Sequence, residues 1–267
     1  MHTTAIEAMR LYCVYAGTFG ATKKKEKTMK LIITILLILN FGVANSQDYK
    51  IGDSLLVNSN GGLNIRKEAN TNSKIIGLLN FGERVFIEAK TKNEKLIKIG
   101  LMNGNWVKVK TNKYEGFIFD AYISKLPQIK KYHKTEFDED ESCFMNTMKE
   151  YIFKELIVID TTNYNNCADG EGAHSMRIYE LKGGHQFIEH GYWESYQIEF
   201  QLNDIRDNEG IQLVKNLFQS CGQYSEELEK KITTVGIMFD ANMGEFCCNM
   251  VTERFGNKFI IRLMGGP

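Results

Sequence analysis

The stretch from Gly62 to Ile123 constrains the fold more than any other part of this chain. Four short runs alternate apolar with polar residues, which is the two-residue period of half-buried strands. The apolar pairs are Leu63 and Ile65, Val85 and Ile87, Val107 and Val109, and Phe117 and Phe119. Glycines that favour turns or bulges separate these runs, at Gly61, Gly62, Gly77, Gly82, Gly104 and Gly116. So many short strands predict a small closed β-barrel, because closure removes exposed sheet edges.

Five motifs in this stretch resemble the bacterial SH3-like (SH3b) family. They are Leu63-Asn64-Ile65-Arg66, Ser73 to Gly82, Trp106 to Val109, Gly116-Phe117-Ile118 and Tyr122-Ile123, and the resemblance covers about residues 50–125. Two residues depart from the family pattern, since Asn70 stands where a proline is common and Phe117 replaces the usual tryptophan. The second change removes an indole N–H donor. The resemblance implies binding of cell-wall peptides, peptidoglycan or a protein segment, commonly as a targeting module for a partner domain.

Four aromatic side chains are the candidate ligand-binding residues. Trp106, Phe117, Tyr114 and Tyr122 could line a groove, because aromatic rings supply contact area at little entropic cost. The alternative for Trp106 and Phe117 is the core of the barrel, whereas Tyr114 and Tyr122 stand at strand margins and favour contact with a ligand. Arg66 could contact the ligand, or it could instead hold a loop through its several donors.

The first 46 residues have the pattern of an export signal preceded by an extension. The apolar run Leu31 to Phe41 follows Lys30, and Ala44-Asn45-Ser46 supplies small residues before Gln47. We therefore expect cleavage before Gln47 and a periplasmic or secreted protein with no membrane span after cleavage. The alternative is a retained membrane anchor. Residues 1–28 form an unusually long lead, and we interpret Met29 as the true start.

Charge divides the exported part into two halves. Residues 47–134 hold 16 Lys and Arg against 8 Asp and Glu, whereas residues 135–267 hold 11 against 23. This shift predicts an SH3b-like barrel at residues 47–126, a linker at 127–141 and a second domain at 142–267. The basic half could favour anionic partners such as wall polymers, although such charge is more often only a solvated face, and the two halves should attract each other.

The second half predicts an α+β domain with a mainly antiparallel sheet, and it resembles no family that we recognise. Helices are expected after the cap Ser142, at Asp207–Cys221 and at Ser225–Lys231. Strands are expected at Leu156–Asp160, Met176–Leu181, Gln186–Glu189, Trp193–Leu202, Thr233–Phe239, Phe246–Glu253 and Lys258–Met264. Gly183-Gly184 indicates a hairpin turn.

No motif in the mature chain marks a catalytic, metal or cofactor site, so the sequence favours a non-catalytic protein with no nucleic-acid partner. The five cysteines after residue 46 are odd in number and match no disulfide framework, which predicts one or two bridges at most. His185 and His190 are five apart and would face opposite sides of a strand, which disfavours metal binding with His174, Cys167, Asp169 or Glu171. Glu199 is expected to face solvent.

Two alternatives remain open for the whole protein. The first is an exported hydrolase that the SH3b-like part targets, with its chemistry in residues 142–267, for which a dyad of Cys167 with a histidine is conceivable. The second is an assembly protein whose acidic half binds a basic partner.

Overall fold

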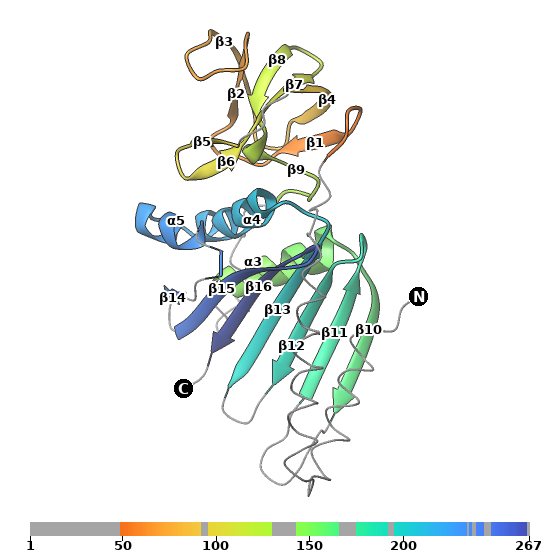
Figure 1. Ribbon diagram of the computed structural model, residues 1–267. Helices are drawn as coiled ribbons and strands as arrows, with labels where there is room; N and C mark the ends of the chain where they lie inside the picture. The colour runs from red at the N-terminus through yellow and green to blue at the C-terminus, as the bar shows by residue number, and fades with distance from the viewer. Residues whose placement is uncertain are drawn as a thin grey trace, which may run out of the picture.

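The computed structural model consists of two antiparallel sheets with helices between them (Figure 1). It describes residues 49–91, 96–129, 143–165, 175–191, 195–233, 235–236, 239–242 and 247–265. The expected export signal, the lead segment and most of the expected linker lie outside these residues. Those three expectations therefore stay predictions.

Residues 54–124 form the first sheet, in the order β3-β2-β8-β7-β4-β1-β9. Its strands are β1 (Ser54–Val57), β2 (Leu63–Arg66), β3 (Ile75–Leu79), β4 (Arg84–Lys90), β7 (Trp106–Lys110), β8 (Glu115–Phe119) and β9 (Ile123–Ser124). A 3-10 turn, η1 (Asp120–Tyr122), joins β8 to β9, and a separate hairpin consists of β5 (Ile97–Ile99) and β6 (Met102–Gly104). All neighbouring strands in this sheet run antiparallel.

The two-residue period decides which side chains enter the core of this sheet. The three predicted pairs on β2, β4 and β7 are all buried in one cluster with Ile118. Strand β8 differs from the prediction, because Ile118 faces that cluster while Phe117 and Phe119 pack against the other one. Gly62 and Gly82 both have a φ of +79°, which L residues rarely adopt, and they make the expected turns. Gly104 and Gly116 lie within strands instead, whereas Gly77 lies in β3 where the β2–β3 register is irregular, as at a bulge.

The expected closed barrel is not confirmed. The described ladder begins at β3 and ends at β9, and no hydrogen-bonded pairing joins those two strands. Strands β2 and β8 are linked by the single pair Arg66–Phe117, so the sheet is weakly joined there as well. The first half is therefore an antiparallel sheet compatible with an SH3-like arrangement.

The second half is mainly antiparallel sheet with few helices. The sheet has the order β10-β11-β12-β13-β16-β15-β14. Its strands are β10 (Val158–Asn165), β11 (Ser175–Leu181), β12 (Gln186–Gly191), β13 (Tyr196–Asn203), β14 (Phe239–Asn242), β15 (Cys247–Phe255) and β16 (Lys258–Gly265). The helices are α3 (Cys143–Glu150), the π-helical turn η2 (Tyr151–Glu155), α4 (Asp207–Ser220) and α5 (Glu226–Ile232).

Most elements of this half agree with the sequence, and two predictions need correction. Gly183 and Gly184 turn the β11–β12 hairpin with φ of +89° and +77°. The predicted strand at 233–239 is wrong, since α5 continues to Ile232 and the strand β14 begins only at Phe239. Glu199 is also not solvent-facing, because it is 8% exposed and its carboxylate lies 3.0 Å from the Arg262 guanidinium.

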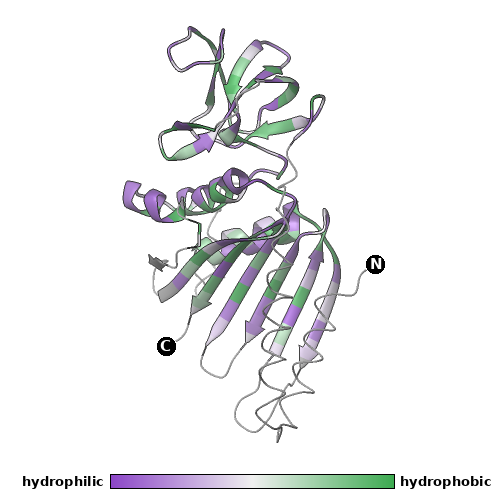
Figure 2. Ribbon diagram, in the orientation of Figure 1, coloured by the Kyte–Doolittle hydropathy of each residue, from purple (hydrophilic) through white to green (hydrophobic). Residues whose placement is uncertain are grey.

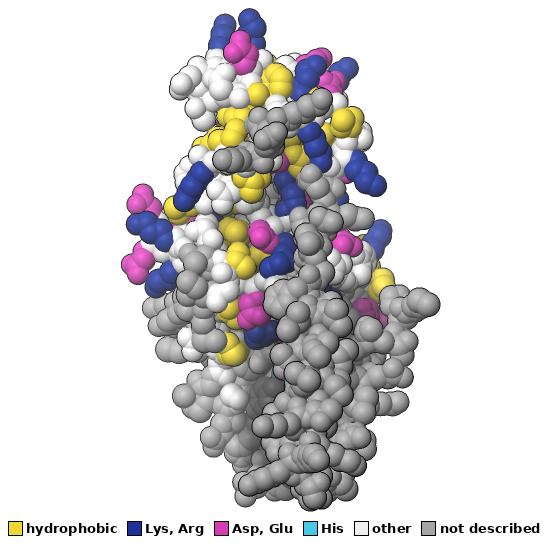
Figure 3. Space-filling model, in the orientation of Figure 1, with side chains coloured by type: hydrophobic (Ala, Val, Ile, Leu, Met, Phe, Trp, Pro, Cys, Tyr) yellow, Lys and Arg dark blue, Asp and Glu magenta, His cyan; other side chains and the backbone are white. Residues whose placement is uncertain are grey.

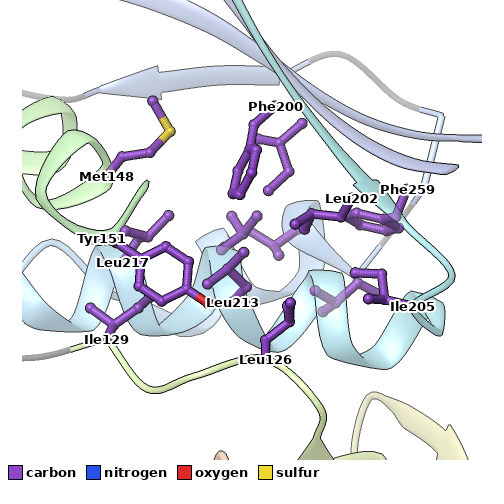
Figure 4. Close-up of a cluster of buried hydrophobic side chains, with 14 of the residues drawn as sticks. Leu126, Ile129, Met148, Tyr151, Phe200, Leu202, Ile205, Leu213, Leu217 and Phe259 are labelled. Atoms are coloured by element: carbon purple, nitrogen blue, oxygen red, sulfur yellow. The ribbon is translucent and has the colours of Figure 1, made fainter. Parts of the chain in front are cut away.

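Helices α3 and α4 cover one face of the second sheet and bury its apolar side chains (Figure 4). Figure 4 shows Met148 and Tyr151 meeting Leu213 and Leu217, with Phe200, Leu202 and Phe259 of the sheet pointing toward them. A disulfide joins Cys143 at the start of α3 to Cys221 just after α4. The hydropathy colouring agrees with this packing, because the strands of the sheet carry apolar bands whereas α5 is mostly hydrophilic (Figure 2).

The buried cluster of the second half continues into the first. Met102, Trp106, Phe119 and Ala121 belong to the same cluster as the helices and sheet of residues 143–265. Leu126 bridges the two parts just before the predicted linker. The predicted boundary between domains therefore crosses a continuous apolar core.

Candidate functional site

Three of the four candidate aromatic residues lie on the outer side of the first sheet, toward the second half. Trp106 on β7 and Phe119 on β8 are directly opposite each other in the register, with ring centroids 6.0 Å apart. Phe119 is in turn 6.1 Å from the Tyr122 ring, and Phe117 packs partly buried against the same cluster. Trp106 is only 4% exposed. Its position favours the core alternative over a surface groove.

Tyr114 packs against a different buried cluster from Trp106 and Phe117. It packs against the buried core of the first sheet, with its ring over Gly77, where an added Cβ would come within 2.6 Å of the ring. This contact explains why β3 has a glycine in mid-strand. Trp106 and Phe117 thus pack against the cluster shared with the second half, Tyr114 against the core of the first sheet, and Tyr122 against both. Ligand contact by Tyr114 or Tyr122 stays a prediction, whereas Arg66 donates to the Ser73 carbonyl at 2.7 Å, which agrees with the loop-holding alternative.

A cavity with a volume of about 580 Å³ lies between the two halves. The β5–β6 hairpin and the start of α4 form facing walls, and the segment after α5 completes it. From the first half, polar side chains come from Asn103, Asn105 and Asp120, and from the second half from Arg206, Asp207, Asn208 and Thr233. The apolar lining consists of Leu96, Leu101, Met102, Ile211 and Val235.

A buried charge network forms one side of the cavity and connects the halves. Asp120 accepts hydrogen bonds from the Tyr49 hydroxyl at 2.6 Å and from the Asn105 backbone N–H at 2.7 Å. Its carboxylate lies 3.5 Å from the Arg206 guanidinium, which also reaches Glu209 and donates to the Ile123 carbonyl at 2.7 Å. Burial alone would lower the pKa of Arg206, but Glu209 and Asp120 raise that pKa above its ordinary value.

Asn105 is the least satisfied polar group of the cavity. Its Oδ1 is buried without a hydrogen-bond partner. Nearby, the Asn208 amide donates to the Asn103 carbonyl and so connects α4 to the hairpin. Sequence reasoning missed the cavity, because its residues come from segments about 100 positions apart. The only local signal was the proximity of Asn103 and Asn105 to the Trp106 motif.

The cysteine and histidine candidates are separated in the structure. Cys143 and Cys221 are paired with each other, a pairing that the sequence did not predict. Buried His185 accepts from the Asn203 backbone N–H through Nδ1 at 3.0 Å, and burial lowers its pKa. Cys167, Asp169, Glu171 and His174 lie outside the described residues. Within the described ranges, no three His, Cys, Asp or Glu side chains gather as metal ligands would.

Comparison with known proteins gives one match. Residues 61–124 match the family model described as bacterial SH3 domain. No curated protein and no solved structure matches the chain. Among the residues that the structure describes, no helix has the length and apolar character to cross a membrane.

Proposed function

Because residues 61–124 match the bacterial SH3 domain, we propose that this chain is an exported binding protein that recognises cell-wall peptide or peptidoglycan. The match is the observation that carries the proposal, since this family is often involved in cell-wall binding. The second half, on this proposal, holds the SH3-like sheet in place and shares a ligand surface with it. If the ligand is a protein segment instead, the chain should not sediment with the wall in the experiment below.

Two further observations support export and an anionic wall partner. The Cys143–Cys221 disulfide suits an oxidising compartment outside the cytoplasm. Lys and Arg side chains, with a few acids among them, gather at the free end of the first sheet in Figure 3. Such a surface attracts polyanions through its summed field.

The cavity has features of a binding site and lacks an evident nucleophile. Both carboxylates in its wall are engaged, Asp120 by Tyr49, Asn105 and Arg206, and Asp207 by Arg254. A carboxylate with its oxygens engaged in this way is a poor general base, because a proton acceptor must reach the substrate directly. We therefore favour binding over hydrolysis.

Incubation of residues 47–267 with purified wall sacculi tests the proposal. We expect the protein to sediment with the wall while no soluble fragments appear. Release of fragments would support the hydrolase, and protein that stays in the supernatant would overturn wall binding. An unrelated protein of matched size and charge is the control, because a basic surface retains some protein on any polyanion.

A further inference from the structure

We propose that strand β10, at the edge of the second sheet, is an interface at which a second copy of this chain pairs antiparallel, so that the two sheets join into one. The proposal concerns assembly and does not depend on wall binding. Three observations support it: the position of β10 in the sheet, the exposure of its side chains, and the way in which its residues oppose one another across a two-fold axis.

Strand β10 lies at one edge of the second sheet, and β11 is its neighbour on the inner side (Figure 1). After a bulge near Val158, its pairing with β11 is regular from Asp160 to Asn165. No residue that the structure describes pairs with the other side of this stretch. Many natural edge strands are blocked by Lys, by Pro or by being very short, whereas β10 has eight residues and neither Lys nor Pro. Its outer side is therefore open to another strand.

The side chains of β10 are exposed on both faces of the sheet. Every residue from Ile159 to Tyr164 is exposed, and Ile159 is 67% exposed. Cross-strand neighbours and a buried face stabilise a strand, and this stretch has one neighbour and no buried face. Phe153 and Ile157, which come just before the strand, are large exposed hydrophobic residues as well. Exposed apolar side chains that lie so close together in the chain favour an interaction site.

The residues of β10 are complementary to themselves in an antiparallel pair. If the two-fold axis is normal to the sheet, paired residues are both even-numbered or both odd-numbered, because the two side chains of a pair lie on one face. With Thr162 on the axis, Thr161 opposes Asn163 and Asp160 opposes Tyr164. Asp160 is the one charged residue of the strand, so like charges do not meet. A second copy therefore supplies a suitable partner for each of these side chains.

The hydrogen bonds that β10 already makes are compatible with this pairing. Oδ1 of Asp160 accepts from the Thr161 backbone N–H at 2.8 Å, and a carboxylate can accept from the Tyr164 hydroxyl of the second copy as well. Oδ1 of Asn163 accepts from Nε of Arg177 at 2.8 Å, so its amide nitrogen is the group that can donate to the opposing Thr161 hydroxyl. The bond from Arg177 also holds the Asn163 side chain in place, which lowers the entropy cost of pairing.

Disulfide trapping in the full mature chain tests both the pairing and its register. Directly opposed residues of an antiparallel pair have Cα atoms about 4.5–5.5 Å apart, a separation that suits a disulfide. Thr162→Cys should therefore give a covalent dimer on mild oxidation. Tyr164→Cys is the matched control on the same strand and face, because the two copies of residue 164 would be roughly 13 Å apart. The unaltered chain, oxidised in parallel, controls for the natural cysteines.

Sedimentation velocity over a concentration series is a second measurement that needs no added thiol. We expect the unaltered chain to dimerise reversibly. Thr162→Lys places two like charges at the axis and should weaken the dimer about fivefold or more. Asn112→Lys adds the same charge at an exposed position between β7 and β8 and should leave the dimer unchanged. Both variants should unfold at the urea midpoint of the unaltered chain, since both positions are exposed.

Dimerisation that Thr162→Lys weakens, together with trapping at residue 162 and not at residue 164, would support the proposal. A monomer at every concentration with no covalent dimer from Thr162→Cys would overturn it and leave the edge to a strand of another protein. A dimer that Thr162→Lys does not weaken would place the interface elsewhere and would overturn it too. Equal trapping of Thr162→Cys and Tyr164→Cys would refute antiparallel pairing about Thr162. Wall sedimentation enters none of these results, so the proposed function is tested separately.

Discussion

Removing the disulfide between Cys143 and Cys221 should cost this protein a large part of its stability. The two cysteines are 78 residues apart, so the bond closes a loop that contains much of the second half. In the chain-entropy model, a loop of that length contributes about 4.5 kcal/mol at 25 °C. Typical domains have roughly 5–15 kcal/mol in total. The double variant Cys143→Ser, Cys221→Ser should therefore be only marginally folded.

Urea unfolding followed by circular dichroism measures the effect. We expect the midpoint of the double variant to fall well below that of the oxidised chain. The slope m should rise, because the unfolded chain becomes less compact once the loop is open. The oxidised chain treated with a reductant is the matched control and should reproduce the variant. If neither change moved the midpoint, the pairing of these two cysteines would be refuted.

Three further predictions follow from buried groups. Trp106→Ala should destabilise the full chain by about 3–5 kcal/mol, and both sheets should unfold together in proteolysis because Trp106 lies in their shared core; a wild-type unfolding midpoint would contradict this. Arg206→Met should cost about 3–5 kcal/mol, measured by urea unfolding, because it leaves the buried carboxylates of Asp120 and Glu209 without their cation; the surface variant Lys74→Met is the control. The pKa of His185 is lowered in the folded protein, so the unfolded chain takes up the proton first and stability should fall as pH drops below about 6.5. His185→Asn should flatten that part of the pH profile, and an unchanged slope would rule His185 out as its cause.

The contact between the halves differs from the expected attraction of a basic for an acidic half. The buried ion pair has the opposite signs, with Asp120 from the basic half and Arg206 from the acidic half. Apolar side chains surround this contact. Because buried pairs are screened less than exposed ones, we expect the contact to persist at high salt. Salt should screen only the attraction between the exposed charges of the two halves.

Local patterns were enough to predict most of the elements. Alternation identified β2, β4 and β7, because a strand with one buried face must place every second residue in the core. The helix expected at Asp207–Cys221 corresponds to α4, and Gly222 just after it has a φ of +69°, which suits a residue that follows a helix. The five motifs between Leu63 and Ile123 predicted the SH3-like part, and the family comparison confirms that part at residues 61–124.

Only the tertiary structure determined which distant segments of the chain contact each other. The pairing of Cys143 with Cys221, the burial of Glu199 beside Arg262 and the outward direction of Phe119 have no local signal. Each of these depends on which surfaces pack together. Alternation along one strand does not show whether another part of the chain covers its second face. The cavity follows the same rule, since Asn105 and Arg206 become neighbours only when the first sheet packs on α4. Sequence patterns therefore determined the elements of this protein, whereas the packing of its two halves determined the candidate site.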